Sequence, residues 1–391
     1  MNLTYVLGNG MDLQLGLPTR FSDFYEWAQK NGKENMFLPH TYDEKCIEDW
    51  ADYESILIDI FNDYLLVFSN RSDEIKINKY KNFYFEQLKN NQEPLKKGKE
   101  EFFNFLIDEV DSVSNMLQEY LEVTDSEIKN IKDIEVIFYK IKERFLHIDR
   151  LFQNDTKTRE RIENYIRKFD RANRRINIIT LNYTCTSEML YYAFKNSENV
   201  KINRNNTTFN NGNSLIYLHG RLPSPQWNEG ITIGIHSKNE IVENFRDLED
   251  AKYLVKSEKM AEIIGSKVYS DAKRILSDNA NIIICYGISF GNSDRSLLAA
   301  VINKARKNNA LIIFYEYINS DKSLARTRMH LKSKIVKRIT SSFSDLTQED
   351  IQNIKNNLIA VPINDNINLI PKELRLFDYA PENIQNKEPI I

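Results

Sequence analysis

The sequence has few cysteines and few histidines, and neither type is spaced as in a metal site. The three cysteines, Cys46, Cys185 and Cys285, lie far apart and form no CxxC pair. The five histidines form no HExxH motif or comparable ligand spacing. This pattern excludes a four-cysteine zinc ribbon and argues against a disulfide framework. We therefore expect no bound metal, and a reducing compartment, the cytoplasm, as the location.

Long apolar runs and a strong charge bias are also missing. No apolar stretch in the 391 residues approaches the roughly 18 residues that indicate a membrane-spanning helix. The N-terminus lacks a basic region followed by a longer apolar one, so we expect no secretion signal. Hydrophobic residues make up 41% and charged residues 28%, and the formal net charge is −3. This balance predicts a globular protein with neither a membrane nor a nucleic acid as its partner.

Short apolar runs rich in β-branched residues predict the strands of a sheet. They lie at 3–7, 175–183, 214–220, 231–235, 281–287 and 310–316, with a candidate last run at 357–363. Most are continuously apolar, which is typical of parallel strands that are buried on both faces. Helical patterns at 186–196, 257–277 and 294–307 separate several of them. The sequence therefore predicts an α/β fold, with a Rossmann-like, mostly parallel sheet flanked by helices.

A long helical stretch separates the first strand from the others. Between residues 20 and 172 there is no convincing strand, and apolar residues recur every three or four positions in 47–68, 99–122 and 133–152. We therefore predict a Rossmann-like domain formed by residues 1–20 and 173–391, with an all-helical insertion at 21–172. The apolar stripes of the insertion pack within the helical region and onto the sheet, or part of this surface forms a homo-oligomer or a lid over the site.

Glycines and polar residues follow the predicted strands, where a parallel sheet of this type binds its ligand. These positions hold Gly8-Asn9-Gly10, Thr180-Leu181-Asn182, His219-Gly220 and Gly287-Ile288-Ser289, followed by Asp294. A strand that turns through glycines into a helix can present backbone N–H groups to an anion. Ordinary structural explanations also exist: Asn182 as a helix cap, His219 as a buried imidazole, and the glycines as tight turns.

The order and spacing of these motifs resemble two protein families. Gly8 and Gly10, followed by Gly16 and Pro18, are similar to the sirtuin loop GAGxSxxxGIP. The segments TLN (180–182), HG (219–220) and GIS (287–289) are similar to the sirtuin segments T-Q-N, H-G and G-x-S. More closely, GNGMDLQLGLPTRFSDF, TLNYT, LHG and YGISFGNSD resemble the bacterial abortive-infection AbiH family, which is distantly sirtuin-like.

The resemblance implies an anti-phage protein that binds NAD as its substrate and hydrolyses it to nicotinamide and ADP-ribose without a metal. It implies catalytic roles for Asn182 and His219. It implies that the nucleotide is bound by Gly8, Asn9, Gly10, Asp12, Gly16, Thr180, Gly287, Ser289 and Asp294. A freely active enzyme of this kind would harm its host, so we expect a phage-derived or partner-protein trigger.

Three departures from the sirtuin pattern limit what can be transferred. The loop serine is replaced by Asp12, and the aspartate of T-Q-N-x-D is replaced by Thr184. The four zinc cysteines are absent, which disfavours protein deacylation. Asp12 places a negative charge where the sirtuin loop handles a diphosphate. We therefore expect Asp12 either to contact a ribose hydroxyl or to cap the helix that follows.

The proposed residue types suit cleavage of the nicotinamide–ribose bond. Because nicotinamide leaves as a neutral group, the enzyme must mainly position a nucleophile and stabilise an oxocarbenium-like centre. An amide such as Asn182 can orient water, and an imidazole such as His219 can accept a proton. Two alternatives stay open: a non-catalytic module that binds NAD or ADP-ribose and switches the helical region, and a toxin of another class such as a nuclease. No acidic metal cluster or basic aromatic patch favours a nuclease.

Overall fold

The computed structural model describes most of the chain, and the statements below concern these parts. They are residues 2–33, 35, 37, 50–69, 98–146, 155–168, 175–196, 214–223, 230–235, 237–256, 267–288, 295–307, 309–318, 324–343, 345–364 and 368–377.

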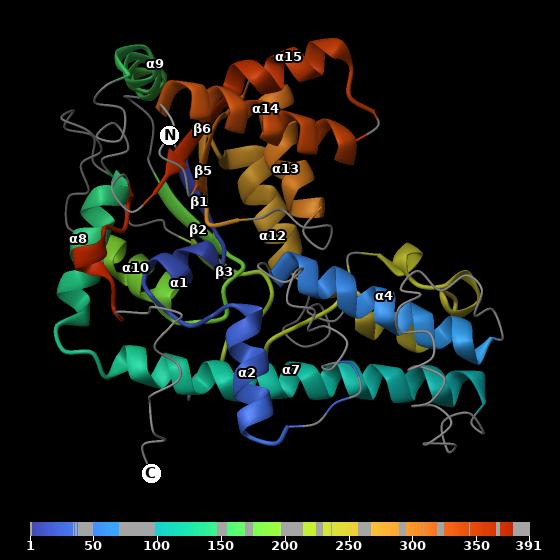
Figure 1. Ribbon diagram of the computed structural model, residues 1–391. Coiled ribbons are helices and arrows are strands. Elements are labelled where there is room, and N and C mark those ends of the chain that lie inside the picture. Colours follow the sequence, from blue (N-terminus) through green and yellow to red (C-terminus); the bar gives the residue numbers. More distant parts are fainter. Residues whose placement is uncertain are drawn as a thin grey trace.

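A sheet of six parallel strands lies at the centre of the fold, in the order β3-β2-β1-β4-β5-β6 (Figure 1). The strands are β1 (Asn2–Leu7), β2 (Arg175–Thr180), β3 (Ser214–Tyr217), β4 (Ile282–Tyr286), β5 (Leu311–Tyr317) and β6 (Leu358–Ile363). This is the strand order of the doubly wound Rossmann fold, whose ligands lie beyond the carboxyl ends of the strands where the order reverses. The predicted α/β fold with a mostly parallel sheet is confirmed, and every strand pair is parallel.

The register of the sheet aligns the carboxyl ends of four strands. Leu7 pairs with Thr180 on one side and with Tyr286 on the other, and Thr180 pairs with Tyr217. The residues that follow these four positions therefore emerge at one level, at the same edge of the sheet. The turn after β1 thus lies between the turns after β2 and β4.

Helices cover both faces of the sheet (Figure 1). One face packs against α8 (Ile134–Leu146), α9 (Thr156–Arg167) and α10 (Thr186–Lys195), and also against α1 (Gly10–Gln14). The other face packs against α12 (Val268–Arg274), α13 (Arg295–Arg306), α14 (Leu324–Ser342) and α15 (Gln348–Asn357). Side chains alternate across β1: Tyr5 belongs to the first core and Val6 to the second, as the pleat of a strand requires.

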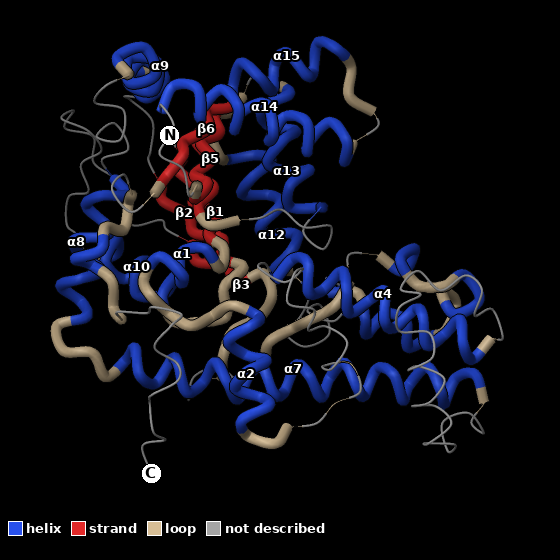
Figure 2. The backbone as a smooth tube through the Cα atoms, in the orientation of Figure 1, coloured by secondary structure: helices blue, strands red, loops and turns tan. Residues whose placement is uncertain are grey.

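A further core lies beyond the carboxyl edge of the sheet and is built mainly from helices (Figure 2). It contains α2 (Phe21–Lys30), α4 (Trp50–Phe68) and the long helix α7 (Lys99–Lys129), together with short 3₁₀ helices at Lys238–Glu240, Glu243–Phe245 and Glu249–Leu254. We call this group the helical core. Helices α8 and α9 also lie between residues 21 and 172, but they pack on the sheet. The division into two domains stays a prediction.

The run ITIGI at 231–235 does not form the strand that its composition suggests. Ile231 makes an isolated antiparallel bridge with Gly220, and Ile235 makes an isolated parallel bridge with Val255. The three isoleucines are buried in the helical core and not in the sheet. A short apolar run indicates burial more reliably than it indicates a strand, which explains the wrong prediction.

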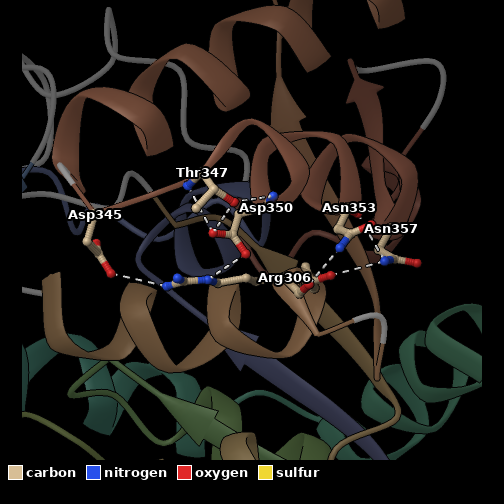
Figure 3. A network of polar contacts seen from close by, with 7 residues as sticks. Arg306, Asp345, Thr347, Asp350, Asn353 and Asn357 are labelled. Carbon is tan, nitrogen blue, oxygen red and sulfur yellow. Dashed lines mark hydrogen bonds and ion pairs between the residues drawn. The ribbon is translucent and has the colours of Figure 1, made fainter.

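Polar contacts fasten α15 to the end of α13 (Figure 3). Arg306 of α13 forms ion pairs with Asp345 at 3.1 Å and with Asp350 at 2.7 Å. From α15, the Asn353 and Asn357 amides donate to the carbonyl oxygens of Arg306 and Ala305, both at 3.1 Å. The last carbonyls of α13 lack partners within their own helix, so these two asparagines satisfy them.

The first prediction concerns the cap of α15. The Thr347 hydroxyl accepts from the Asp350 N–H at 3.1 Å, and the Asp350 carboxylate accepts from the Thr347 N–H at 2.9 Å. Thr347→Ala removes the first bond and should lower the free energy of unfolding by about 1 kcal/mol. Urea unfolding followed by circular dichroism measures it. Thr340→Ala, in the last turn of α14, is the control and should change the midpoint less, because its hydroxyl bonds only to the Lys337 carbonyl of its own helix and alanine favours helix. Equal effects of the two substitutions would contradict the capping role.

Candidate functional site

Three glycines bring the turn after β1 into direct contact with the turn after β4. A Cβ atom at Gly8 would lie 2.5 Å from the Gly287 carbonyl oxygen, and one at Gly10 would lie 2.5 Å from the Gly287 Cα. Gly287 has a φ of +67°, in the left-handed region that favours glycine. A Cβ at Gly287 would lie 2.5 Å from the Met11 nitrogen. Close backbone packing therefore requires glycine at all three positions.

Several polar groups of this turn are hydrogen-bonded within the protein. The N–H groups of Gly8 and Gly10 donate to carbonyls at the end of β4 and just after it, both at 3.0 Å, and the Met11 N–H donates to the Gly8 carbonyl. The Asn9 amide donates to the Thr19 carbonyl at 2.8 Å. The predicted nucleotide-binding role of the turn stays a prediction, and a ligand would find these N–H groups already bonded to carbonyl oxygens.

Gly16 lies at the other end of α1 and packs against the segment 368–377. Its φ is +82°, and a Cβ there would lie 2.1 Å from the Phe377 carbonyl oxygen. The neighbouring Leu15 carbonyl accepts from the Leu376 N–H at 2.7 Å. The structure therefore does not bring Gly16 together with Gly8 and Gly10, although the three share one sequence motif.

Asp12 is a buried carboxylate in the first turn of α1, with 1% of its surface exposed. Its two oxygens accept from the hydroxyls of Thr184 at 2.8 Å, in the turn after β2, and Thr186 at 2.6 Å, the first residue of α10. Burial raises the pKa of Asp12 from its ordinary value of 3.8 to about 6, although hydrogen bonds from Thr186, Thr184 and Asn182 lower it. The carboxylate thus ties the first two turns of the site together.

A second buried carboxylate reaches the same turn from the helical core. Asp125, near the end of α7, is 4% exposed and accepts from the Cys185 N–H at 2.7 Å. Lys129, one helical turn later, pairs with it at 2.6 Å. The charge on Asp125 also contributes to the raised pKa of Asp12. Asp125 could not be predicted from the sequence, because it lies on a long amphipathic helix far from the motifs.

Asn182 lies two residues beyond β2 and is 3% exposed. Its amide is close enough to Asp12 to lower the pKa of that carboxyl. Even so, neither the oxygen nor the nitrogen of the amide makes a hydrogen bond of normal geometry with the described residues. A buried amide without a partner costs roughly 1–3 kcal/mol, and such groups are rare in folded proteins. This amide is available to a ligand or a water molecule.

Thr180, the last residue of β2, stabilises the turn that carries Asn182. It is fully buried, and its hydroxyl oxygen accepts from the Ser187 hydroxyl at 2.8 Å and from the Asn182 N–H at 3.1 Å. These contacts fix the path of the chain from β2 into α10. The role of Thr180 in binding the nucleotide stays a prediction, and the two contacts of its hydroxyl oxygen shape the turn that carries Asn182.

His219 lies two residues beyond β3, in register with Asn182 on the neighbouring strand. It is 5% exposed, and its ring lies 6.3 Å from the ring of Tyr183, measured between centroids. The His219 carbonyl accepts from the Thr232 N–H, and the Tyr183 hydroxyl donates to the Thr232 carbonyl. The structure therefore places both predicted catalytic residues at the same edge of the sheet, in adjacent turns.

A positive charge that the sequence analysis missed lies next to His219. Arg221 is 11% exposed in its side chain and lies 4.0 Å from the Glu188 carboxylate of α10. Its guanidinium also lies over the Tyr217 ring, 5.8 Å from the centroid. The pattern HGR following a strand would have been the signal for it. Ser289 and Asp294, which were predicted to bind the nucleotide, lie outside the described residues.

The described residues were also searched for metal-binding clusters and membrane spans. Within them, no three or more His, Cys, Asp or Glu side chains gather where they could hold a metal ion. Among the same residues, no helix has both the length and the apolar character needed to cross a bilayer.

Most of the chain matches a known protein family. No curated protein matches the chain. Residues 4–316 match the family described as bacteriophage abortive infection AbiH. The matched part begins in β1 and ends in β5, so it includes the helical core and every turn of the candidate site. Since the match covers well over half of the 391 residues, the chain belongs to the bacteriophage abortive infection AbiH family.

Proposed function

We propose that this protein acts in abortive infection by hydrolysing NAD to nicotinamide and ADP-ribose. Membership of the family supports a role in defence against phage. The chemistry is our proposal, and the buried, unpartnered Asn182 amide at the carboxyl edge of a Rossmann-ordered sheet is the observation that carries it. The resemblance of four motifs to those of sirtuins supports NAD as the nucleotide.

In this proposal the Asn182 amide binds the attacking water. The Asn182 amide oxygen makes no hydrogen bond with the described residues, so it can hold a polar molecule, and its burial fixes the direction in which that molecule points. Positioning of this kind suits a reaction whose leaving group departs with little acid catalysis. Asp12 lies beside the amide and accepts hydrogen bonds, so it favours an orientation with the Asn182 nitrogen toward the carboxylate.

His219 is the proposed general base. The imidazole emerges at the level of Asn182 from the adjacent strand, and an imidazole nitrogen can accept a proton from a bound water. It would accept a proton from the attacking water or from a ribose hydroxyl. Arg221 offers a guanidinium at this edge for a phosphate oxygen, which is useful because the N–H groups of Gly8 and Gly10 already have acceptors.

Activity of this kind needs restraint before infection. We propose that a phage-derived component or a partner protein acts as trigger, and that the helical region carries the restraint, as a lid or through a homo-oligomer. These features would explain how a cell tolerates an enzyme that destroys a central cofactor.

The second prediction tests the catalytic pair. Asn182→Ala and His219→Ala should each lower NAD turnover on the order of a hundredfold or more, because each removes a group that acts on the attacking water. Nicotinamide release by purified protein, with lysate from phage-infected cells added as a source of trigger, measures it. The matched control is Asn177→Ala, which removes a buried asparagine that lies within β2, away from the carboxyl edge of the sheet. This control should cost stability and leave turnover per folded molecule unchanged.

Two results would contradict the proposal. If both alanine variants hydrolyse NAD like the unmodified protein, these residues are not catalytic. If NAD and ADP-ribose bind and NAD is never cleaved, while protection against phage persists, the protein is a nucleotide-binding switch and not a hydrolase.

A further inference from the structure

We infer that Asp125 on α7 is a positioning residue, through which the helical core sets the geometry of the candidate site. This inference rests on the proposed function, because it concerns how the same site is held and regulated. It starts from the contacts that one helix makes with three separate turns.

Helix α7 contacts the turns after β1 and β2 directly and the turn after β3 through Gly230. The Tyr120 hydroxyl donates to the Pro18 carbonyl, at the end of the glycine-containing segment after β1. Asp125 accepts from the Cys185 N–H in the turn after β2. The Gln118 side chain lies against Gly230, where an added Cβ would be 3.4 Å from its Oε1. Gly230 packs in turn on Gly220, the residue after His219.

The contact of Asp125 is the most direct of the three. Cys185 is the N-cap of α10, where backbone N–H groups have no helical carbonyl as partner, and Asp125 supplies the acceptor for the N–H of this residue. The bond is 2.7 Å long and buried, and Cys185 lies between Thr184 and Thr186, the two donors to Asp12. Movement of Asp125 would therefore displace the segment that holds both the Asp12 carboxylate and the Asn182 amide.

The rest of α7 belongs to the helical core. Residues from Phe102 to Leu121 pack there, whereas Ile128 packs with the sheet. A helix of 31 residues is about 46 Å long and stiff, so a shift at one end reaches the other. Binding of a trigger to the helical core would thus change the site through Asp125, and occupation of the site would change the helical core by the same coupling energy.

The chemistry of Asp125 permits a sharp comparison of variants. Asp125→Asn keeps an oxygen that can accept from the Cys185 N–H. Asp125→Ala removes the acceptor. Asp108→Ala is the matched control, because Asp108 lies exposed on the same helix. If Asp125→Ala does not accumulate as folded protein, Asp125→Glu replaces it, since it keeps the charge and displaces it by one methylene.

The third prediction concerns these variants, tested as full-length proteins. We expect Asp125→Ala to lower kcat for NAD at least tenfold with KM changed less than threefold, and to lower protection against phage at least tenfold. The Asp125→Asn and Asp108→Ala variants should stay within threefold of the unmodified protein. Amide hydrogen exchange should show faster exchange at residues 182–188 in Asp125→Ala alone. With ADP-ribose as probe, exchange in residues 99–113 should slow in the unmodified protein and not in Asp125→Ala.

The outcomes separate this inference from the proposed function. If the unmodified protein neither binds ADP-ribose nor cleaves NAD, the proposed function fails, and the effects on protection and on exchange at 182–188 still decide the role of Asp125. Protection and exchange in Asp125→Ala equal to those of Asp108→Ala would overturn the positioning role. Loss in Asp125→Asn as severe as in Asp125→Ala would also overturn it, because the acceptor would then not be the important feature.

Discussion

Replacing Asp12 with asparagine should make the folded protein more stable at neutral pH, although it removes a charge from the candidate site. Burial raises the pKa of Asp12 from 3.8 to about 6 in the folded protein. Between these values the folded state binds more protons than the unfolded state, so stability falls as pH rises through this window and levels off above about pH 6. The loss amounts to about 3 kcal/mol, and asparagine, which does not titrate, avoids it.

Urea unfolding of Asp12→Asn and the unmodified protein at a series of pH values tests this fourth prediction. The difference in unfolding free energy should be smallest below about pH 4 and largest above about pH 6. Asp155, the N-cap of α9, provides a control of opposite sign. Its pKa is lowered, because hydrogen bonds from Thr158 and the charge of Arg328 outweigh desolvation. Asp155→Asn should therefore destabilise the protein at neutral pH. A pH-independent difference for Asp12→Asn would contradict the burial of a charged Asp12.

The fifth prediction compares two glycines that share a backbone conformation and differ in their surroundings. Gly287 and Gly32 have φ values of +67° and +62°. A Cβ at Gly287 would lie 2.5 Å from the Met11 nitrogen, whereas a Cβ at Gly32 would have nothing within 4 Å. Gly32→Ala should cost about 1–2 kcal/mol, for the left-handed conformation alone. Gly287→Ala should cost about 1–3 kcal/mol more, because backbone atoms must move apart.

Thermal and urea unfolding of the two glycine variants measures this difference. The comparison isolates close packing between the turns after β1 and β4, since the conformational cost is common to both variants. Equal losses would show that these turns separate easily, as a site that opens widely would require. A larger loss of unfolding free energy for Gly287→Ala would indicate that the turns after β1 and β4 are held rigidly together at the candidate site.

The sheet could be predicted from the sequence because continuous apolar runs are typical of parallel strands buried on both faces. The run at 281–287 became β4, whose five residues are all buried. The run at 231–235 is equally apolar, yet it packs in the helical core. The composition of a segment indicates that it is buried, but it does not indicate which other elements the segment packs against. That distinction depends on long-range packing, which the local pattern does not contain.

Two residues that depart from the sirtuin motifs are in direct contact in the folded protein. Asp12 replaces the loop serine and Thr184 replaces an aspartate, and these two side chains are hydrogen-bonded at 2.8 Å. The sequence shows each replacement separately, and only the fold shows that the residues meet. Asp125 was beyond prediction for a similar reason, because its partner is a backbone N–H 60 residues away in sequence.

The glycines of the opening motif were predicted to bind phosphate, and the structure adds a different requirement for them. Gly8 and Gly10 permit close contact with Gly287, and Gly16 permits close contact with Phe377. The spacing of the motif therefore reports two separate packing contacts. A role in ligand binding for this turn stays a prediction that needs its own test.

Nicotinamide release from NAD by the full-length protein tests the central claim most directly. Purified protein is incubated with NAD alone and with lysate from phage-infected cells as a source of trigger, and NAD is followed in cells during infection. We predict that the unmodified protein releases nicotinamide and ADP-ribose from NAD in equal amounts in the presence of lysate. The Asn182→Ala variant should release neither product above background. Intact NAD in both settings, with protection against phage retained, would contradict the account.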